Sequence, residues 1–296
     1  MYCCVSIELF DVPLNVLYNN CMIKDELEYL EFSNNRSHLK LTLQGAHIFE
    51  FQVKGEEPLL FLSETAVFKK GVPIRGGIPI CWPWFGPHPS DKHLPNHGFA
   101  RVLLWEYLST EHISADKTKI ILRLGSSEET LKFWPHSFEL RVEILMSDIL
   151  EVSLTTSNTG KDSFSLTQAL HSYVRVDEIS RVSLKGLVGC GYYNKVDDTY
   201  DNRQEKDLLF QSEVDRVYSN VTEVLTFQED KQQVRVETKG SETVVVWNPG
   251  AKLLEKMPDL SSYKTMLCIE SANTLDDALI IHPKQSHTLT TILSQV

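Results

Sequence analysis

The sequence predicts an all-β protein, and two observations carry that prediction. Short segments in which apolar and polar residues alternate recur along the chain, and clusters of turn residues separate them. Convincing helical periodicity is scarce. Many short strands with few helices are typical of a β sandwich.

The individual strands follow from their side-chain alternation. In residues 38–53, Leu39, Leu41 and Leu43 share one face of a strand, and a turn at Gly45 leads into a second strand. One short helix is predicted over residues 127–133, because Ser127 is a good N-cap and two carboxylates follow it in the first turn. Further strands are predicted at residues 120–124, 138–145, 150–156, 234–237, 244–247 and 288–293.

Length and composition limit the organisation of the chain. It has 296 residues, of which 42% are hydrophobic, and it shows neither an internal repeat nor a low-complexity linker. We therefore predict an N-terminal extension at residues 1–25 and a single β-sandwich domain at residues 26–296. The net charge of −11 argues against a nucleic-acid partner, because phosphate contact requires a basic surface.

Location and cofactors are predicted from what the sequence lacks. No stretch approaches the ~20 apolar residues of a membrane span, and the N-terminus lacks the basic start of a signal peptide. The six cysteines are scattered and form no C-x-x-C pair, as expected for free thiols in a reducing compartment. We expect a cytoplasmic, monomeric protein with neither a membrane partner nor a cofactor.

The segment 75–101 is the strongest functional signal in the sequence. Its glycines and prolines are incompatible with a regular helix or a central strand, and its aromatic residues indicate an ordered loop. We expect this loop to bring Arg75, His97 and Arg101 to one pocket. An arginine fork suits a carboxylate or a phosphate, so the two arginines predict an anion site.

Two further residues are candidates for proton transfer. His171 lies on the strand-like face that also holds Ala169 and Tyr173, and it is either a general acid or a structural histidine. Glu270 ends an apolar strand, and it is either a general base or a strand-end carboxylate that reaches water. Spacing alone leaves both pairs of alternatives open.

The remaining candidates carry weaker signals. Asp215 could orient a ligand hydroxyl or form an ordinary surface salt bridge. A metal site built from His88, His93, His97 and Cys81 is disfavoured, because their spacing matches no familiar zinc pattern. We therefore predict no metal ligand.

Several motifs together resemble one protein family. RGGIPICWPWFGP, LPNHGFAR, ALHSYVRV, EVDRVY, VVVWNP and MLCIESAN occur in this order between residues 27 and 294. The sequence is similar in these segments to the glucose-6-phosphate 1-epimerases, or hexose-6-phosphate mutarotases, of the aldose 1-epimerase superfamily. The resemblance implies an antiparallel β supersandwich of the galactose mutarotase type and a small sugar phosphate as substrate.

The resemblance also implies roles for individual residues. His171 matches the general acid of the family and Glu270 its general base. The other matching positions are substrate contacts, in which the arginines hold the phosphate, the aspartate binds sugar hydroxyls, and asparagine replaces a common glutamine: Arg75, Asn96, His97, Arg101 and Asp215.

The implied activity is interconversion of the α and β anomers of an aldohexose 6-phosphate by acid/base ring opening and reclosure. Two alternatives stay open: a non-catalytic carbohydrate-binding or sensing protein, and an epimerase of unphosphorylated sugars. The pair of His171 and Glu270 disfavours the first, because a binder needs no acid and base. The two arginines disfavour the second, because a neutral hexose offers them no anionic partner.

Overall fold

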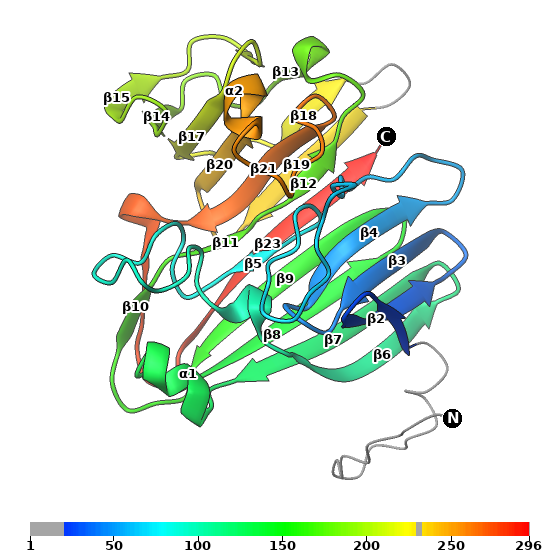
Figure 1. Cartoon of the computed structure of the whole chain (residues 1–296), viewed down its shortest axis with the longest axis vertical. Coiled ribbons are helices and arrows are strands. Elements are labelled where there is room, and N and C mark those ends of the chain that lie inside the picture. Colours follow the sequence, from blue (N-terminus) through cyan, green and yellow to red (C-terminus); the bar gives the residue numbers. More distant parts are fainter. Residues whose placement is uncertain (1–20, 229–232, 296) are drawn as a thin grey trace.

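The computed structural model describes residues 21–228 and 233–295, and the regular secondary structure of this part of the chain is mostly antiparallel β (Figure 1). Two large sheets form the body of the protein. The seven-stranded sheet contains, in order of pairing, β18 (Leu225–Gln228), β19 (Gln233–Lys239), β23 (Ser286–Gln295), β9 (Ile149–Asn158), β8 (Phe138–Met146), β7 (Lys117–Gly125) and β6 (Glu106–Ser114).

The eight-stranded sheet carries most of the residues predicted to be functional. Its order is β15 (Thr199–Arg203), β14 (Gly191–Asn194), β17 (Val214–Ser219), β20 (Thr243–Asn248), β21 (Met266–Asn273), β11 (Gln168–Leu170) and β5 (Ile80–Cys81), and β12 (Tyr173–Arg175) also pairs with β21.

Smaller elements complete the described structure. A four-stranded sheet contains β1 (Cys21–Lys24), β2 (Leu27–Ser33), β3 (Ser37–Thr42) and β4 (His47–Val53). Two strand pairs are β10 (Phe164–Leu166) with β22 (Leu279–Ile281), and β13 (Ser183–Leu184) with β16 (Leu208–Leu209). The helices are α1 (Glu128–Phe133), α2 (Gly250–Leu254) and the short 3-10 turns η1 (Ala100–Val102), η2 (Ile179–Arg181) and η3 (Leu275–Asp277).

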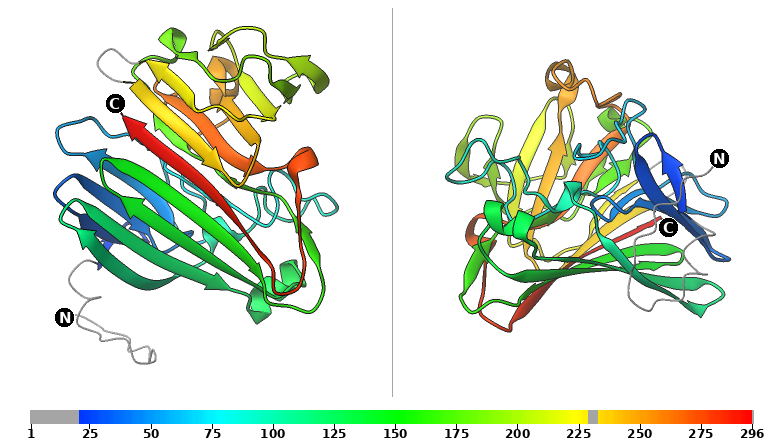
Figure 2. Two further views of the ribbon diagram at one scale, coloured as in Figure 1. Left: turned by 180° about the vertical axis from the view of Figure 1, so that it is seen from behind. Right: turned by 60° about the horizontal axis from the view of Figure 1, so that its bottom comes forward.

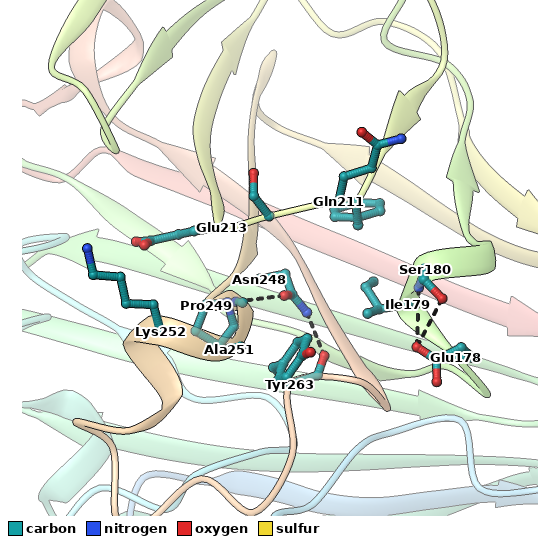
Figure 3. Close-up of a pocket in the computed structure, with 13 residues that line it drawn as sticks. Glu178, Ile179, Ser180, Gln211, Glu213, Asn248, Pro249, Ala251, Lys252 and Tyr263 are labelled. Carbon is teal, nitrogen blue, oxygen red and sulfur yellow. Dashed lines mark hydrogen bonds between the residues drawn. The ribbon is translucent and has the colours of Figure 1, made fainter.

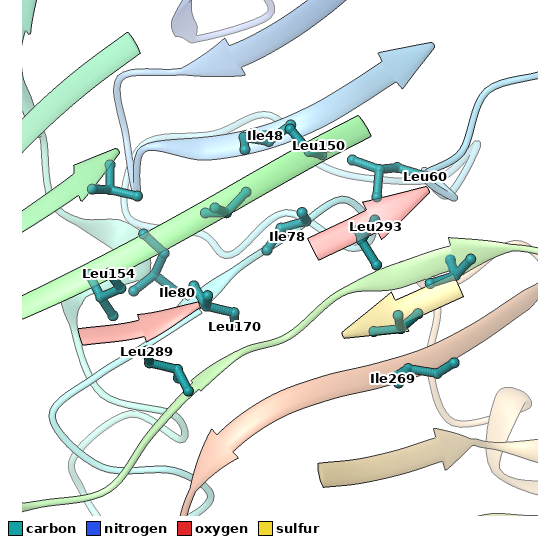
Figure 4. Close-up of a cluster of buried hydrophobic side chains, with 14 of the residues drawn as sticks. Ile48, Leu60, Ile78, Ile80, Leu150, Leu154, Leu170, Ile269, Leu289 and Leu293 are labelled. Atoms are coloured by element: carbon teal, nitrogen blue, oxygen red, sulfur yellow. The ribbon is translucent and has the colours of Figure 1, made fainter. Parts of the chain in front are cut away.

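The main hydrophobic core lies between the sheets. β23 runs beside β9 in the seven-stranded sheet (Figure 2), and β21 and β11 of the other large sheet pack against β23. Figure 4 shows aliphatic side chains from both sides meeting there, among them Leu154, Leu289 and Ile269, each of which is completely buried. β9 alternates buried and half-buried residues throughout, so one face covers the core and the other does not.

The structure confirms the predicted fold class and the predicted strands. The helix over residues 127–133 is also confirmed: α1 begins after Ser127, whose side chain accepts a hydrogen bond from the Thr130 backbone N–H in a capping box. Residues 1–20 of the predicted N-terminal extension lie outside the described residues. The rest of that segment includes β1, which pairs with β2.

The predicted strand around His171 is interrupted. β11 ends at Leu170 and β12 begins at Tyr173, while the His171 backbone N–H donates to the carbonyl of Pro79 rather than to β21. Leu170 and Val174 still point into the main core. The break therefore leaves the predicted alternation of faces intact and inserts His171 between two strands.

Candidate active site

The candidate site lies on the face of the eight-stranded sheet that points away from the main core. Val246 and Ile269 face the core, so their neighbours Trp247, Cys268 and Glu270 face the other way. Cross-strand register then aligns these outward residues: Asp215 stands opposite Trp247, and Trp247 opposite Cys268. One row across three strands thus carries polar and aromatic groups from distant parts of the sequence.

His171 and Glu270 are in direct contact at this face. His171 Nε2 lies 3.3 Å from Glu270 Oε1, and the two residues are only 8% and 1% exposed. His171 Nδ1 and Glu270 Oε2 are both buried without a hydrogen-bond partner. Tyr173 stacks on the imidazole with ring centroids 4.8 Å apart, which fixes the plane of the ring. The site therefore presents two polar atoms without hydrogen-bond partners beside the contact between His171 and Glu270.

Burial sets the electrostatics of the pair. Removal from water raises the pKa of Glu270 well above its ordinary value, an effect that the nearby Lys195 opposes and Asp215 reinforces. Burial lowers the pKa of His171 well below its ordinary value, and the neighbouring His97, Arg101 and Arg75 add to that effect. Both shifts favour the uncharged forms, a neutral imidazole and a protonated carboxyl group.

Three side chains at the same site lie close enough together to be considered as metal ligands. Ligand atoms of His171, Cys268 and Glu270 all lie within 4.8 Å of one another, the one such group found in residues 21–228 and 233–295. Burial also raises the pKa of the Cys268 thiol well above its ordinary value. Because the thiolate is the metal-binding form, a thiol held protonated is a poor ligand.

Arg75 is already engaged by the protein. Its Nε and Nη2 atoms each lie 3.0 Å from Asp259 Oδ2, and its Nη1 donates to the Tyr173 hydroxyl at 3.0 Å. The Asp259 carboxylate offsets much of its charge. Arg75 therefore bridges the loop at residues 255–265 to the aromatic ring that supports His171.

Arg101 has a freer guanidinium. Its Nη2 donates to the Asn96 carbonyl oxygen at 2.6 Å, and its buried Nε has no hydrogen-bond partner. The Asn96 residue is exposed, and its backbone rather than its side chain makes this contact. Arg101 thus retains donors for an anion.

His97 is held by the loop in an unusual backbone conformation. Its φ of 64° lies in the left-handed region, and Gly86 N–H donates to its Nδ1 at 3.2 Å. Burial, together with the positive charges of Arg101, Lys195 and Arg75, lowers the pKa of His97 to about 3. The ring is therefore neutral near pH 7, and because Nδ1 accepts, its proton sits on Nε2.

Asp215 completes the set of predicted residues. Its Oδ2 atom lies 3.0 Å from Lys195 Nζ, whereas its buried Oδ1 has no hydrogen-bond partner. Electrostatic interactions connect these groups. The Asp215 charge raises the pKa of Glu270, and the charges of Arg75 and Arg101 lower the pKa of His97 and of His171. Six of the residues predicted from sequence thus act on one another, and Asn96 joins them through its carbonyl contact with Arg101.

Sequence reasoning missed two contributors to this pocket. Lys195 follows β14 in a segment without a recognisable motif, and Trp247 lies 6.3 Å from His171 between ring centroids. A signal for Trp247 was available, because it belongs to the VVVWNP motif. No sequence signal identifies Lys195, which is brought to Asp215 only by the pairing of β14 with β17.

A second hollow of about 530 Å³ lies elsewhere, beside α2 (Figure 3). The buried Asn248 among its lining residues is hydrogen-bonded within the protein: its amide donates to the Tyr263 and Met266 carbonyls and accepts from Gly250 N–H. Among the described residues that line it, none has a buried polar atom without a partner. The hollow therefore lacks the buried, unpartnered polar atoms that distinguish the site at His171 and Glu270.

Comparison with known proteins shows the family of this chain. Residues 28–294 match the sequence pattern of the aldose 1-epimerase family. The chain belongs to that family. It is accordingly an isomerase that acts on the anomeric centre of an aldose. In the described residues, no helix has the length and apolar composition that crossing a membrane would require.

Individual relatives cover most of the chain. A protein of Escherichia coli K12, provisionally named glucose-6-phosphate 1-epimerase, is 37% identical over 269 residues, which is 89% of each chain. A protein of Cenchrus ciliaris with the same provisional name is 37% identical over 246 residues, 79% of this chain and 74% of its own. The crystal structure of a provisionally assigned mutarotase from Salmonella typhimurium superposes with a TM-score of 0.86 at 31% identity, covering 93% of this chain and 92% of its own.

A more distant structure defines the fold alone. The galactose mutarotase-related enzyme of Lactobacillus acidophilus superposes with a TM-score of 0.69 at 16% identity, over 90% of this chain and 97% of its own. The predicted fold of the galactose mutarotase type is confirmed.

Proposed function

We propose that the protein is a glucose-6-phosphate 1-epimerase, in which Glu270 is the general base and His171 the general acid. The observation that carries the proposal is their buried contact, 3.3 Å between His171 Nε2 and Glu270 Oε1, beside the donors of Arg101. The anomeric oxygen and the ring oxygen of a pyranose are bonded to one carbon. An acid and a base that serve both oxygens must therefore be neighbours.

The reaction follows from these positions. Glu270, as a carboxylate, takes the proton of the anomeric hydroxyl, while His171, as an imidazolium, protonates the ring oxygen. The bond between C1 and O5 breaks and leaves an open aldehyde. Rotation about the C1–C2 bond presents the other face of the carbonyl, and the two proton transfers reverse on closure. Each transfer by a placed group is typically worth ~10² to 10⁴ in rate.

Burial assists the opening step. Ring opening converts an imidazolium and a carboxylate into a neutral imidazole and a carboxylic acid, with the same number of protons in the pair. The uncharged forms are those that burial favours at both residues. Burial thus favours the protonation state that accompanies the open sugar over the charged pair from which opening starts.

We assign the substrate phosphate mainly to Arg101, with Arg75 as a weaker contact. His97 and Asn96 lie beside the phosphate, and Asp215 binds the sugar hydroxyls. Arg101 keeps a buried, unpartnered Nε, whereas Arg75 is shared with Asp259. Charge-assisted hydrogen bonds to phosphate are of the strong kind, and remote binding energy then holds the ring between acid and base. The runner-up, a sugar-binding protein without turnover, leaves the buried acid/base pair without a purpose.

One experiment tests this proposal. The rate of α/β exchange is measured by NMR with glucose, galactose and their 6-phosphates, for the wild type and for Arg101→Ala and Arg75→Ala. Arg101→Ala should lower kcat/KM for glucose 6-phosphate by about 10- to 100-fold and leave the free hexose little changed, and Arg75→Ala should lose less. Equal losses on both kinds of substrate would remove the phosphate assignment.

We also propose that the protein works as a monomer in the cytoplasm. Three free cysteines among the described residues, Cys81, Cys190 and Cys268, fit a reducing compartment. Sedimentation at micromolar concentration should give a mass near the 33.8 kDa of one chain. A larger mass would refute the monomer.

A further inference from the structure

Lys195 is an exposed lysine at the edge of the site, and its ammonium group contacts Asp215. It follows β14, and its backbone N–H donates to the Asp215 carbonyl at 2.8 Å, so β-sheet pairing fixes it opposite that residue. Its Nζ atom lies 3.0 Å from Asp215 Oδ2 and 5.7 Å from the centroid of the Phe85 ring. Lys195 therefore joins the eight-stranded sheet to the aromatic loop.

The contact with Lys195 gives the two oxygens of the Asp215 carboxylate different environments. Oδ2 is held by the ammonium group, and Oδ1 is buried with no hydrogen-bond partner. A carboxylate gripped at one oxygen cannot rotate freely, so the other oxygen keeps one direction. A fixed, unpartnered acceptor suits a sugar hydroxyl, because a neutral donor completes it without adding charge.

We propose that Lys195 is a positioning residue of the epimerase: it fixes Asp215 for the sugar hydroxyls and cancels the Asp215 charge beside Glu270. The inference rests on the proposed function of the pocket. Asp215 would otherwise place a second negative charge next to the catalytic base, and like charges resist ionisation of the base.

The electrostatics of Glu270 support this role. Apart from burial, its pKa responds to Lys195, which lowers it, and to Asp215, which raises it. The charged or titratable groups that surround the pocket include the cations Arg75 and Arg101 and the residues His97, His171 and Cys268. Lys195 and Asp215 thus act on the base in opposite directions and form one unit.

Three variants separate positioning from simpler roles. Lys195→Met should lower kcat/KM by about 10- to 100-fold for glucose and for glucose 6-phosphate alike, because Asp215 serves the ring that both substrates share. Lys195→Arg should recover part of the loss, since it keeps a charge for Asp215. Lys161→Met, an exposed lysine with no part in the pocket, is the matched control and should behave as the wild type.

The pH profile supplies a readout that a merely structural residue would not move. Because the pKa of Glu270 lies above that of His171, the basic limb of kcat/KM reports Glu270. Loss of Lys195 should shift this basic limb to higher pH, and Asp215→Asn should shift it to lower pH. The double variant should return the limb close to the wild-type position. Opposite shifts that cancel support a charge pair acting on Glu270, whereas shifts in one direction, or none, overturn the proposal.

The substrates distinguish the remaining outcomes. A loss in Lys195→Met confined to the 6-phosphates would make Lys195 a phosphate contact and overturn the positioning role. A kcat/KM of Lys195→Met within twofold of the wild type would also overturn that role. If the wild type itself fails to exchange all four sugars, the proposed function falls instead. Unfolding midpoints should match across the variants, and if Lys195→Met does not fold, Lys195→Gln takes its place in every arm.

Discussion

His47 should make the stability of this protein depend on pH. The residue is 1% exposed at the start of β4, and its Nε2 atom has no hydrogen-bond partner. Burial lowers its pKa to about 3; a hydrogen bond to the Gly76 backbone opposes this, and the charge of Arg101 adds to it. In the unfolded chain the same group titrates near ~6.5.

The sign and size of the effect follow from proton binding. Between about pH 3 and pH 6.5 the unfolded chain binds a proton at His47 that the native protein excludes. Stability is therefore fully present above pH 6.5 and is lost as the pH falls, by about 1.4 kcal/mol per unit. From pH 7 to pH 5 the loss through this one residue is about 2 kcal/mol.

Urea unfolding at pH 7, 6 and 5 measures the effect. His47→Asn removes the titration, and its amide stands in place of Nδ1, the ring nitrogen left to donate to Gly76. The free energy of unfolding of the wild type should fall by about 2 kcal/mol more than that of His47→Asn between pH 7 and pH 5.

A neighbouring core variant serves as the control. Ile48→Val should cost about 0.5 to 1.5 kcal/mol equally at each pH, because it removes a methylene group and no titratable group. If His47→Asn lost as much stability as the wild type between pH 7 and pH 5, His47 would be protonated in the native state and the reasoning from burial would fail.

Three further predictions concern catalysis, the loop and metals. His171→Asn and Glu270→Gln should each lower kcat by about 10² to 10⁴ with little change in KM, and near-wild-type exchange at saturating substrate would contradict the acid/base roles. Gly98→Ala should unfold at a much lower temperature, because φ is +70° and a β-carbon would overlap the Trp82 carbonyl oxygen; an unchanged melting temperature would refute this. Dialysis against a chelator should leave the exchange rate unchanged, since the Cys268 thiol is held protonated; loss of activity with recovery on zinc would reverse that expectation.

The sequence by itself determined the strands and their faces. Alternation has a period of two, so it states which side of a strand meets the core before the partner strand is known. The alternation placed Glu270 and Ile269 on opposite faces of one strand, and it placed His171 and Tyr173 on the same face. The structure has the same arrangement. Cap chemistry is equally local, which is why Ser127 marked the start of α1 correctly.

The motifs identified the candidate residues, yet they did not distinguish the two arginines. Both flank one loop in the sequence, and spacing treats them as equals. The partner of Arg75 is Asp259, 184 positions away, whereas Arg101 bonds to Asn96 five positions away. The pairing with Asp259 depends on how the loop at residues 255–265 folds back, and no local pattern reports it.

Only the tertiary structure decided the protonation states of His171 and Glu270 and the position of Lys195. The pKa directions of His171 and Glu270 come first from burial, which is a property of everything packed around them. Lys195 reaches Asp215 because β14 pairs with β17 in one register. Register and packing are sums over many weak contacts between distant segments, so a single stretch of sequence does not contain them.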